Sequence, residues 1–129
     1  MKKIITLLLL LVCQLLHAQT FFDAAGRIVG RMDGNYVRSE TGRTLGRIES
    51  EAVYDATGRI IGRCDGERVF DGSGKIIGRF EDGRIYNASG RQIGRIDGEY
   101  CYDAAGRRIG RGQDVRRKYM ILFFYFFFY

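Results

Sequence analysis

Short apolar runs alternate with polar, glycine-containing stretches from Phe22 to Arg117, and the whole pattern returns every sixteen residues, six times without a gap. The copies begin at residues 22, 38, 54, 70, 86 and 102. Two glycines mark every copy, and an arginine always follows the second: Gly26, Gly42, Gly58, Gly74, Gly90 and Gly106, then Gly30, Gly46, Gly62, Gly78, Gly94 and Gly110. Such a fixed period predicts one supersecondary unit stacked on copies of itself.

Each copy carries two turn signals separated by strand-forming residues. Three residues before the first glycine, five copies have an acidic or amide side chain that can accept bonds from backbone N–H groups two residues on: Asp23, Asp55, Asp71, Asn87 and Asp103. Asp65-Gly66 and its equivalents are typical of tight hairpin turns, and pairs such as Val69-Phe70 favour strand. With eighteen glycines in the chain, helix is disfavoured in the repeats. Each unit therefore predicts two short strands and two tight turns.

The predicted fold is all-β, with six hairpins arranged radially in a closed or nearly closed, flower-like array. A lone short hairpin is marginal in water, so the copies must pack on one another. The second glycine interrupts a strand, which indicates that a bulky group packs against it. We expect that group to be the aromatic residue of an adjacent copy: Phe22, Tyr54, Phe70, Tyr86 or Tyr102. The second copy departs from the pattern, with Arg38, Thr44 and Ala52, and should be the loosest.

A different pattern follows the repeats. Residues 119–129 are apolar or aromatic without exception, and Arg116, Arg117 and Lys118 precede them. Such a segment needs cover, and as a helix it is too short to cross a bilayer. It can fill the centre of the ring, dock on a partner or on copies of itself in a homo-oligomer, or insert into a membrane surface beside the basic triplet.

The first residues have the layout of a secretory signal. Lys2 and Lys3 precede an apolar run over residues 4–12, and Leu16-His17-Ala18 resembles a cleavage site. We expect residues 1–18 to be removed, leaving a repeat domain over 19–118 and the apolar tail 119–129, with no transmembrane helix. This places the product in the periplasm or on the surface of a Gram-negative bacterium. Val12 before Cys13 argues against lipid attachment, since lipoprotein signals carry a small residue there.

Few residues are suited to catalysis. His17 is the only histidine and lies in the predicted leader, which excludes a His-based nucleophile pair or general base. We predict no enzyme, no catalytic residues, no cofactor and no metal site, because each acidic turn residue stands alone among arginines rather than in a calcium loop. Cys64 and Cys101 stand where other copies have aliphatic residues, so they are expected in the core; a disulfide between them is the alternative.

The arginine after each second glycine is the one candidate binding position: Arg31, Arg47, Arg63, Arg79, Arg95 and Arg111. In five copies an acidic residue follows two places later, on the same side of an extended strand: Asp33, Glu49, Asp65, Glu81 and Asp97. This spacing predicts local pairing of arginines with carboxylates between neighbouring strands, as a ladder. The alternative is an anion-binding surface for a glycan or a lipid headgroup.

Charge does not indicate a nucleic-acid partner. Lys2 and Lys3 lie in the predicted leader, which leaves 19 basic and 15 acidic residues with alternating signs and no basic block.

The stretch Tyr54-Asp55-Ala56-Thr57-Gly58-Arg59-Ile60-Ile61-Gly62-Arg63, behind a signal-like segment and ahead of a Phe-rich end, resembles the small exported bacterial β-flower proteins, described as four-fold or five-fold. The Tyr-Asp-x-x-Gly-Arg core is also similar, less specifically, to the YD repeats of bacterial toxins. The β-flower resemblance implies radial β-hairpins and no established activity. With six units here, either one copy is peripheral or the ring is larger than the family's. Our hypothesis is a non-enzymatic structural or interaction module whose partner is an unidentified protein or envelope component.

Overall fold

The computed structural model describes residues 19–129. The predicted leader, with Cys13 and His17, lies outside the described residues. Longer and shorter strands alternate along the chain, and they are β1 Thr20–Asp23, β2 Ile28–Asp33, β3 Tyr36–Arg38, β4 Thr44–Glu49, β5 Ala52–Asp55, β6 Ile60–Asp65, β7 Arg68–Asp71, β8 Ile76–Glu81, β9 Arg84–Asn87, β10 Gln92–Asp97, β11 Tyr100–Asp103 and β12 Arg108–Gln113. Two short helices follow, α2 (Arg117–Ile121) and the π-helix η1 (Leu122–Phe127).

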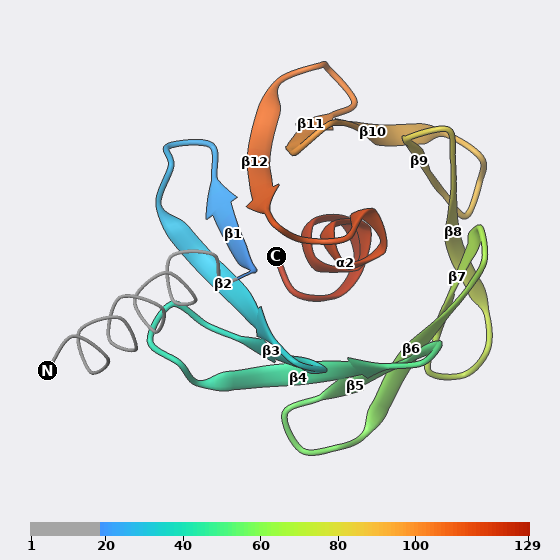
Figure 1. Ribbon diagram of the computed structural model, residues 1–129. Coiled ribbons are helices and arrows are strands. Elements are labelled where there is room, and N and C mark those ends of the chain that lie inside the picture. Colours follow the sequence, from blue (N-terminus) through green and yellow to red (C-terminus); the bar gives the residue numbers. More distant parts are fainter. Residues whose placement is uncertain (1–18) are drawn as a thin grey trace, which may run out of the picture.

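The strands form one closed antiparallel barrel. Each strand pairs with its neighbours in the chain, and β1 closes the ring by pairing with β12, from Thr20 opposite Gln113 to Asp23 opposite Gly110. In Figure 1 the barrel is seen along its axis, with the hairpins around the rim and the C-terminal segment coiled in the middle. Closure leaves no strand edge unpaired. The radial all-β prediction is confirmed, and all six copies contribute to the ring.

Two kinds of turn define the two ends of the barrel. At one end, which we call the Asx end, an aspartate or asparagine side chain accepts bonds from two backbone N–H groups of its own turn. Asp55 Oδ1, for example, accepts from Thr57 N at 2.9 Å and from Arg59 N at 3.0 Å. In the second copy Ser39 Oγ takes this role, with Arg43 N at 3.1 Å. At the other end, which we call the tight-turn end, residues such as Gly66 (φ 52°) reverse the chain between paired strands.

A β-bulge beside each second glycine brings one extra aliphatic side chain toward the interior. In every repeat the strand register skips one residue. For example, Val53 is opposite Gly62 and Tyr54 is opposite Ile60, so Ile61 is skipped. The skipped residues are partly buried and pack against the core: Val29, Leu45, Ile61, Ile77, Ile93 and Ile109. Bulges also increase the bend of a strand, which a narrow ring needs.

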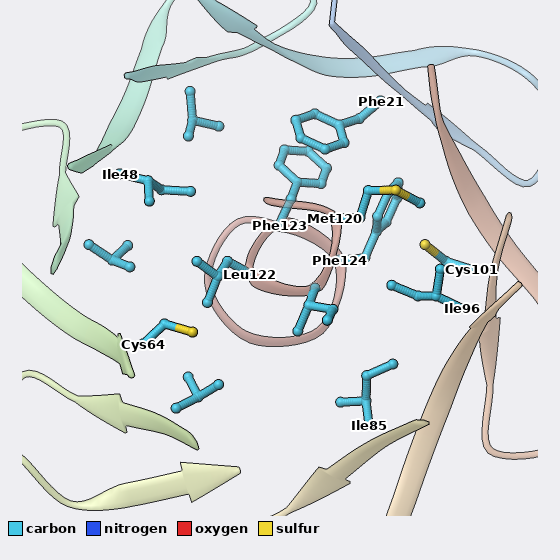
Figure 2. Packing of buried hydrophobic residues seen from close by; sticks show 14 of the residues in the cluster. Phe21, Ile48, Cys64, Ile85, Ile96, Cys101, Met120, Leu122, Phe123 and Phe124 are labelled. Atoms are coloured by element: carbon cyan, nitrogen blue, oxygen red, sulfur yellow. The ribbon is translucent and has the colours of Figure 1, made fainter. Parts of the chain in front are cut away.

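The tail fills the barrel, which is the first of the three arrangements predicted for it. Met120, Ile121, Leu122, Phe123 and Phe124 are buried, and Phe123 stacks on Phe21 with ring centroids 4.0 Å apart (Figure 2). The six consecutive aromatic residues 123–128 each lie against the second glycine of a different copy. The pairs are Phe123 with Gly30, Phe124 with Gly110, Tyr125 with Gly94, Phe126 with Gly78, Phe127 with Gly62, and Phe128 with Gly46.

This one-to-one match corrects the expected filler of the glycine positions. The aromatic residues of the adjacent copies do not occupy them; the tail does. In an α-helix, side chains four residues apart share a face, yet Phe123 and Phe127 contact glycines on different strands, β2 and β6. The wider π-helical turn, closed by Phe128 N donating to Phe123 O at 3.3 Å, allows successive rings to face successive repeats.

Candidate functional site

The six predicted arginines form a belt around the outside of the barrel, which we call the arginine girdle: Arg31, Arg47, Arg63, Arg79, Arg95 and Arg111. Each follows an inward-facing glycine, and strand alternation turns the arginine outward. The glycines are buried, whereas the arginines are exposed or partly exposed. The structure therefore brings all six to one surface belt rather than to one pocket.

Five girdle arginines lie over an aromatic ring of the neighbouring strand. The guanidinium carbon is 4.0 to 4.5 Å from the ring centroid in the pairs Arg47–Tyr54, Arg63–Phe70, Arg79–Tyr86, Arg95–Tyr102 and Arg111–Phe22. The partners are directly opposite in the strand register, as Arg63 is to Phe70. Exposed contacts of this type contribute roughly 0.5–1 kcal/mol each. The recurring aromatic residue thus serves the outer surface of the barrel.

The predicted ladder of arginine–carboxylate pairs between neighbouring strands forms only in part. Arg47 pairs with Glu49 at 2.6 Å, Arg79 with Glu81 at 3.2 Å and Arg95 with Asp97 at 4.0 Å, but each of these pairs lies within a single strand. Asp65 does pair between neighbouring strands, at 3.3 Å, but with Arg68 outside the girdle, because these two residues are directly opposite across the tight turn. Asp33 likewise pairs with Arg38 at 2.9 Å, and Arg111 pairs with Glu99 at 3.7 Å.

Arg31 differs from the other girdle arginines. The residue opposite it in the register is Arg38, where the other copies have an aromatic ring. The Arg38 guanidinium has other partners, since it donates hydrogen bonds to Asp33 Oδ2 at 2.9 Å and to Thr44 Oγ1 at 2.8 Å. Two like charges directly opposite each other are unfavourable. The girdle is therefore discontinuous at the second copy.

The two described thiols are free and buried in the core, as predicted, and no disulfide joins them. Burial raises the pKa of both, and that of Cys101 reaches about 12. Both side chains are therefore neutral at ordinary pH and unsuited to nucleophilic chemistry. Burial also raises the pKa of Tyr125, whose hydroxyl donates to Tyr102 O at 2.7 Å.

Several surface hollows are shallow grooves between neighbouring Asx turns, and another, of about 350 Å³, lies at the tight-turn end beside Met120. One of about 570 Å³ is lined by residues 43–45 and 55–57, and another of about 520 Å³ involves residues 59–61 and 71–73. Within residues 19–129 no group of three or more His, Cys, Asp or Glu residues is placed to hold a metal ion. The same residues include no helix with the length and apolar character needed to cross a membrane.

The stacked girdle was not predicted from the sequence, although a signal for it is present. The arginine and the aromatic residue that follows it seven places later face each other across a hairpin, and this spacing recurs in four places, as in Arg63 and Phe70. The fifth stack, Arg111 on Phe22, forms only where β12 pairs with β1 to close the ring. The aromatic residues were expected in the core, because the repeat period does not reveal the diameter of the ring.

Together these features define a class of protein: a closed ring of β-hairpin repeats whose core is supplied by an aromatic C-terminal segment of the same chain. The family described as 5-fold beta-flower protein matches residues 18–128, and the chain belongs to that family. Its ring has six hairpins rather than five. Neither the curated proteins nor the solved structures contain a match to the chain.

Proposed function

We propose that the protein is a non-enzymatic structural or interaction module, exported and retained in the envelope or on the surface of a Gram-negative bacterium. The observation that carries the proposal is the filled barrel: the chain's own aromatic residues occupy the interior, so partners must bind outside. The signal-like leader supports export. Buried neutral thiols and the absence of histidine after residue 18 support a non-enzymatic role.

The export part is tested by following processing in a Gram-negative host. We expect a product that begins at Gln19 in the periplasmic or surface fraction, identified by mass spectrometry of its N-terminus. Ala18→Leu is the matched control, because a bulky residue at the cleavage position blocks processing. An unprocessed wild-type chain that stays in the cytoplasm would contradict the proposal.

A second candidate is a binding protein for an anionic glycan or lipid headgroup, which would use the girdle Arg31, Arg47, Arg63, Arg79, Arg95 and Arg111. Arg31 and Arg38 are directly opposite each other in the strand register and favour it, since an anion bound between these like charges would reduce their repulsion. The test is R63E/R79E/R95E with a heparin-derived oligosaccharide as the probe. Lost binding with an unchanged circular dichroism spectrum supports the candidate. Unfolding would instead indicate that these arginines stabilise the barrel.

A further inference from the structure

The apolar plug is open at one end of the barrel. The tail enters at the tight-turn end, where Lys118 Nζ donates to Ser50 O at 3.0 Å and Met120 lies against Gly112. It then runs toward the Asx end, and its burial falls along the way. Residues 120–124 are buried, residues 125–128 are partly exposed, and Tyr129 is 60% exposed. Aromatic side chains therefore reach the surface at the Asx end.

Aliphatic side chains extend this apolar face outward. The six bulged residues described above are only partly buried and pack against the same core as the last aromatic rings. Beside them, on the outer surface, Ile28, Ile60 and Ile76 are 50%, 46% and 43% exposed. Exposed apolar side chains that gather at one end of a molecule are typical of an interaction site.

A ring of cations surrounds the apolar face. One exposed basic residue follows the glycine of each Asx turn, and we call the set the basic crown: Arg27, Arg43, Arg59, Lys75, Arg91 and Arg107. The carboxylates of these turns fold back onto backbone N–H groups. The side chain of Arg27 is 81% exposed while that of its partner Asp23 is 13% exposed, and Arg107 and Asp103 give 82% and 31%. Apart from Glu40, which is exposed in the second turn, the most exposed charges at this end are therefore positive.

The tight-turn end has the opposite character. Ten of the fifteen acidic residues lie on or beside its turns, against five basic ones, Arg68, Arg84, Arg116, Arg117 and Lys118. The charge of the molecule is thus distributed unequally along the barrel axis. An anionic surface attracts the Asx end and repels the other, which orients the barrel during approach.

We propose that the Asx end docks on an anionic lipid surface, with the aromatic face inserted at the headgroup level and the basic crown on lipid phosphates. Aromatic residues and long basic side chains favour this interface. A second copy fits less well, because an end-to-end dimer would bring crown against crown. The inference names a partner for the envelope module proposed above, and it uses a different surface from the girdle. The basic triplet 116–118 does not take part, since it lies at the other end.

The chain contains no tryptophan, so a single introduced tryptophan reports on one end. The test uses residues 19–129, which hold every strand and the tail, with vesicles of phosphatidylglycerol and phosphatidylcholine in equal parts. Tyr129→Trp should shift its emission to shorter wavelength on adding these vesicles and not on adding pure phosphatidylcholine. Tyr100→Trp, at the tight-turn end, is the matched control and should not shift. A shift in Tyr100→Trp alone would overturn the proposal.

A pair of charge variants separates docking from general attraction. R43Q/R59Q/K75Q/R91Q and R68Q/R84Q/R116Q/R117Q remove the same charge from opposite ends. The crown variant should lower vesicle binding at least about tenfold and the other less than about twofold. Equal losses in the two variants would overturn the proposal, and so would absent binding by a folded wild-type chain at low salt. A stable dimer in sedimentation that Tyr129→Ser dissociates would also overturn it. None of these outcomes depends on the processing experiment, so the two proposals fail separately.

Discussion

The second glycine of each repeat sets how closely the tail can approach the barrel wall. A Cβ atom at Gly78 would lie 2.5 Å from ring atoms of Phe126 and 2.6 Å from Tyr86 O, and the other five positions are equally crowded or nearly so. No side chain fits there without moving the plug. The requirement for glycine thus comes from packing rather than from backbone conformation, since these glycines do not have positive φ.

Gly78→Ala should therefore destabilise the protein by about 1–3 kcal/mol, the usual cost of overpacking. The control is Gly72→Ala at an exposed turn position where other copies carry alanine, such as Ala56 and Ala88. Its Cβ would lie 3.0 Å from Ile60 O, a looser contact than at Gly78, and it should destabilise the protein clearly less, by under about 1 kcal/mol. The urea unfolding midpoints measure both. Equal effects would indicate that the glycine layer is not tightly packed.

The Asx turns predict how stability depends on acid. Bonds to the folded carboxylates lower the pKa of four aspartates: mainly the backbone N–H of Arg27 for Asp23 and of Arg107 for Asp103, and the hydroxyls of Thr57 and Ser73 for Asp55 and Asp71. Their pKa in the unfolded chain is the higher one, near 3.8. Their contribution is therefore complete above about pH 4 and is lost as the pH falls below that value.

Melting temperature as a function of pH tests this prediction. The variant D23N/D55N/D71N/D103N is the control, because Asn87 fills the same place in the fifth copy and accepts the same bonds without a charge, at 3.1 and 3.0 Å. This variant should show a smaller decline below pH 4. An unchanged decline would mean that other carboxylates cause the acid sensitivity.

Among the elements, the second hairpin departs most from the pattern. Its strand β3 has three residues where the equivalent strands have four, and Arg38 replaces the aromatic residue that would stack on Arg31. The sequence predicts that this copy is the loosest. Its amides should therefore exchange with deuterium faster than those of the equivalent strand β7.

Restoring the pattern should stabilise the barrel. Arg38→Tyr places a ring opposite Arg31 and removes a like charge, for an expected gain of about 0.5 kcal/mol. It also removes the partly exposed bonds of Arg38 to Asp33 and Thr44, which keeps the gain small. Arg38→Gln, which removes the charge without adding a ring, is the control. A loss of stability in Arg38→Tyr would show that those bonds matter more than the missing stack.

Much of the element structure could be predicted from the sequence, because it depends on local signals. The strands and both turns of each copy follow from turn residues and β-branched pairs. Asp33 and Asp65 pair with arginines of the neighbouring strand, as predicted, but their partners Arg38 and Arg68 lie outside the girdle, because the strand spacing ignores residues across a tight turn. The π-helical tail and the stacked girdle depend on the diameter of the closed ring. The sixteen-residue length of the repeat does not determine that diameter, so neither feature could be predicted from it.

For the whole molecule, the number of repeats and the length of the aromatic segment match. Six glycines face six consecutive rings, and the order of the rings follows the order of the strands around the barrel. Removing one hairpin should therefore leave one ring without its glycine. The number of glycine-facing aromatic residues in the tail therefore has to equal the number of hairpins in the ring.

Deletion of residues 70–85 removes one unit, and Phe126 is the tail residue that contacts its glycine. We expect this deletion to lower the melting temperature strongly, and the further deletion of Phe126 to restore at least about half of the loss. Deleting Phe126 alone from the six-repeat chain should be destabilising, which completes the cycle. Simple addition of the two losses would refute the match.

Residues 120–128 follow all six hairpins, so the strands of the barrel are synthesised before the segment that fills it. Until then the nascent hairpins have no apolar partner at the axis, and isolated hairpins are marginal in water. Ring closure is therefore a late event in the life of the newly made chain. A polypeptide truncated only a dozen residues early would contain every strand but would lack the apolar core that stabilises the closed barrel.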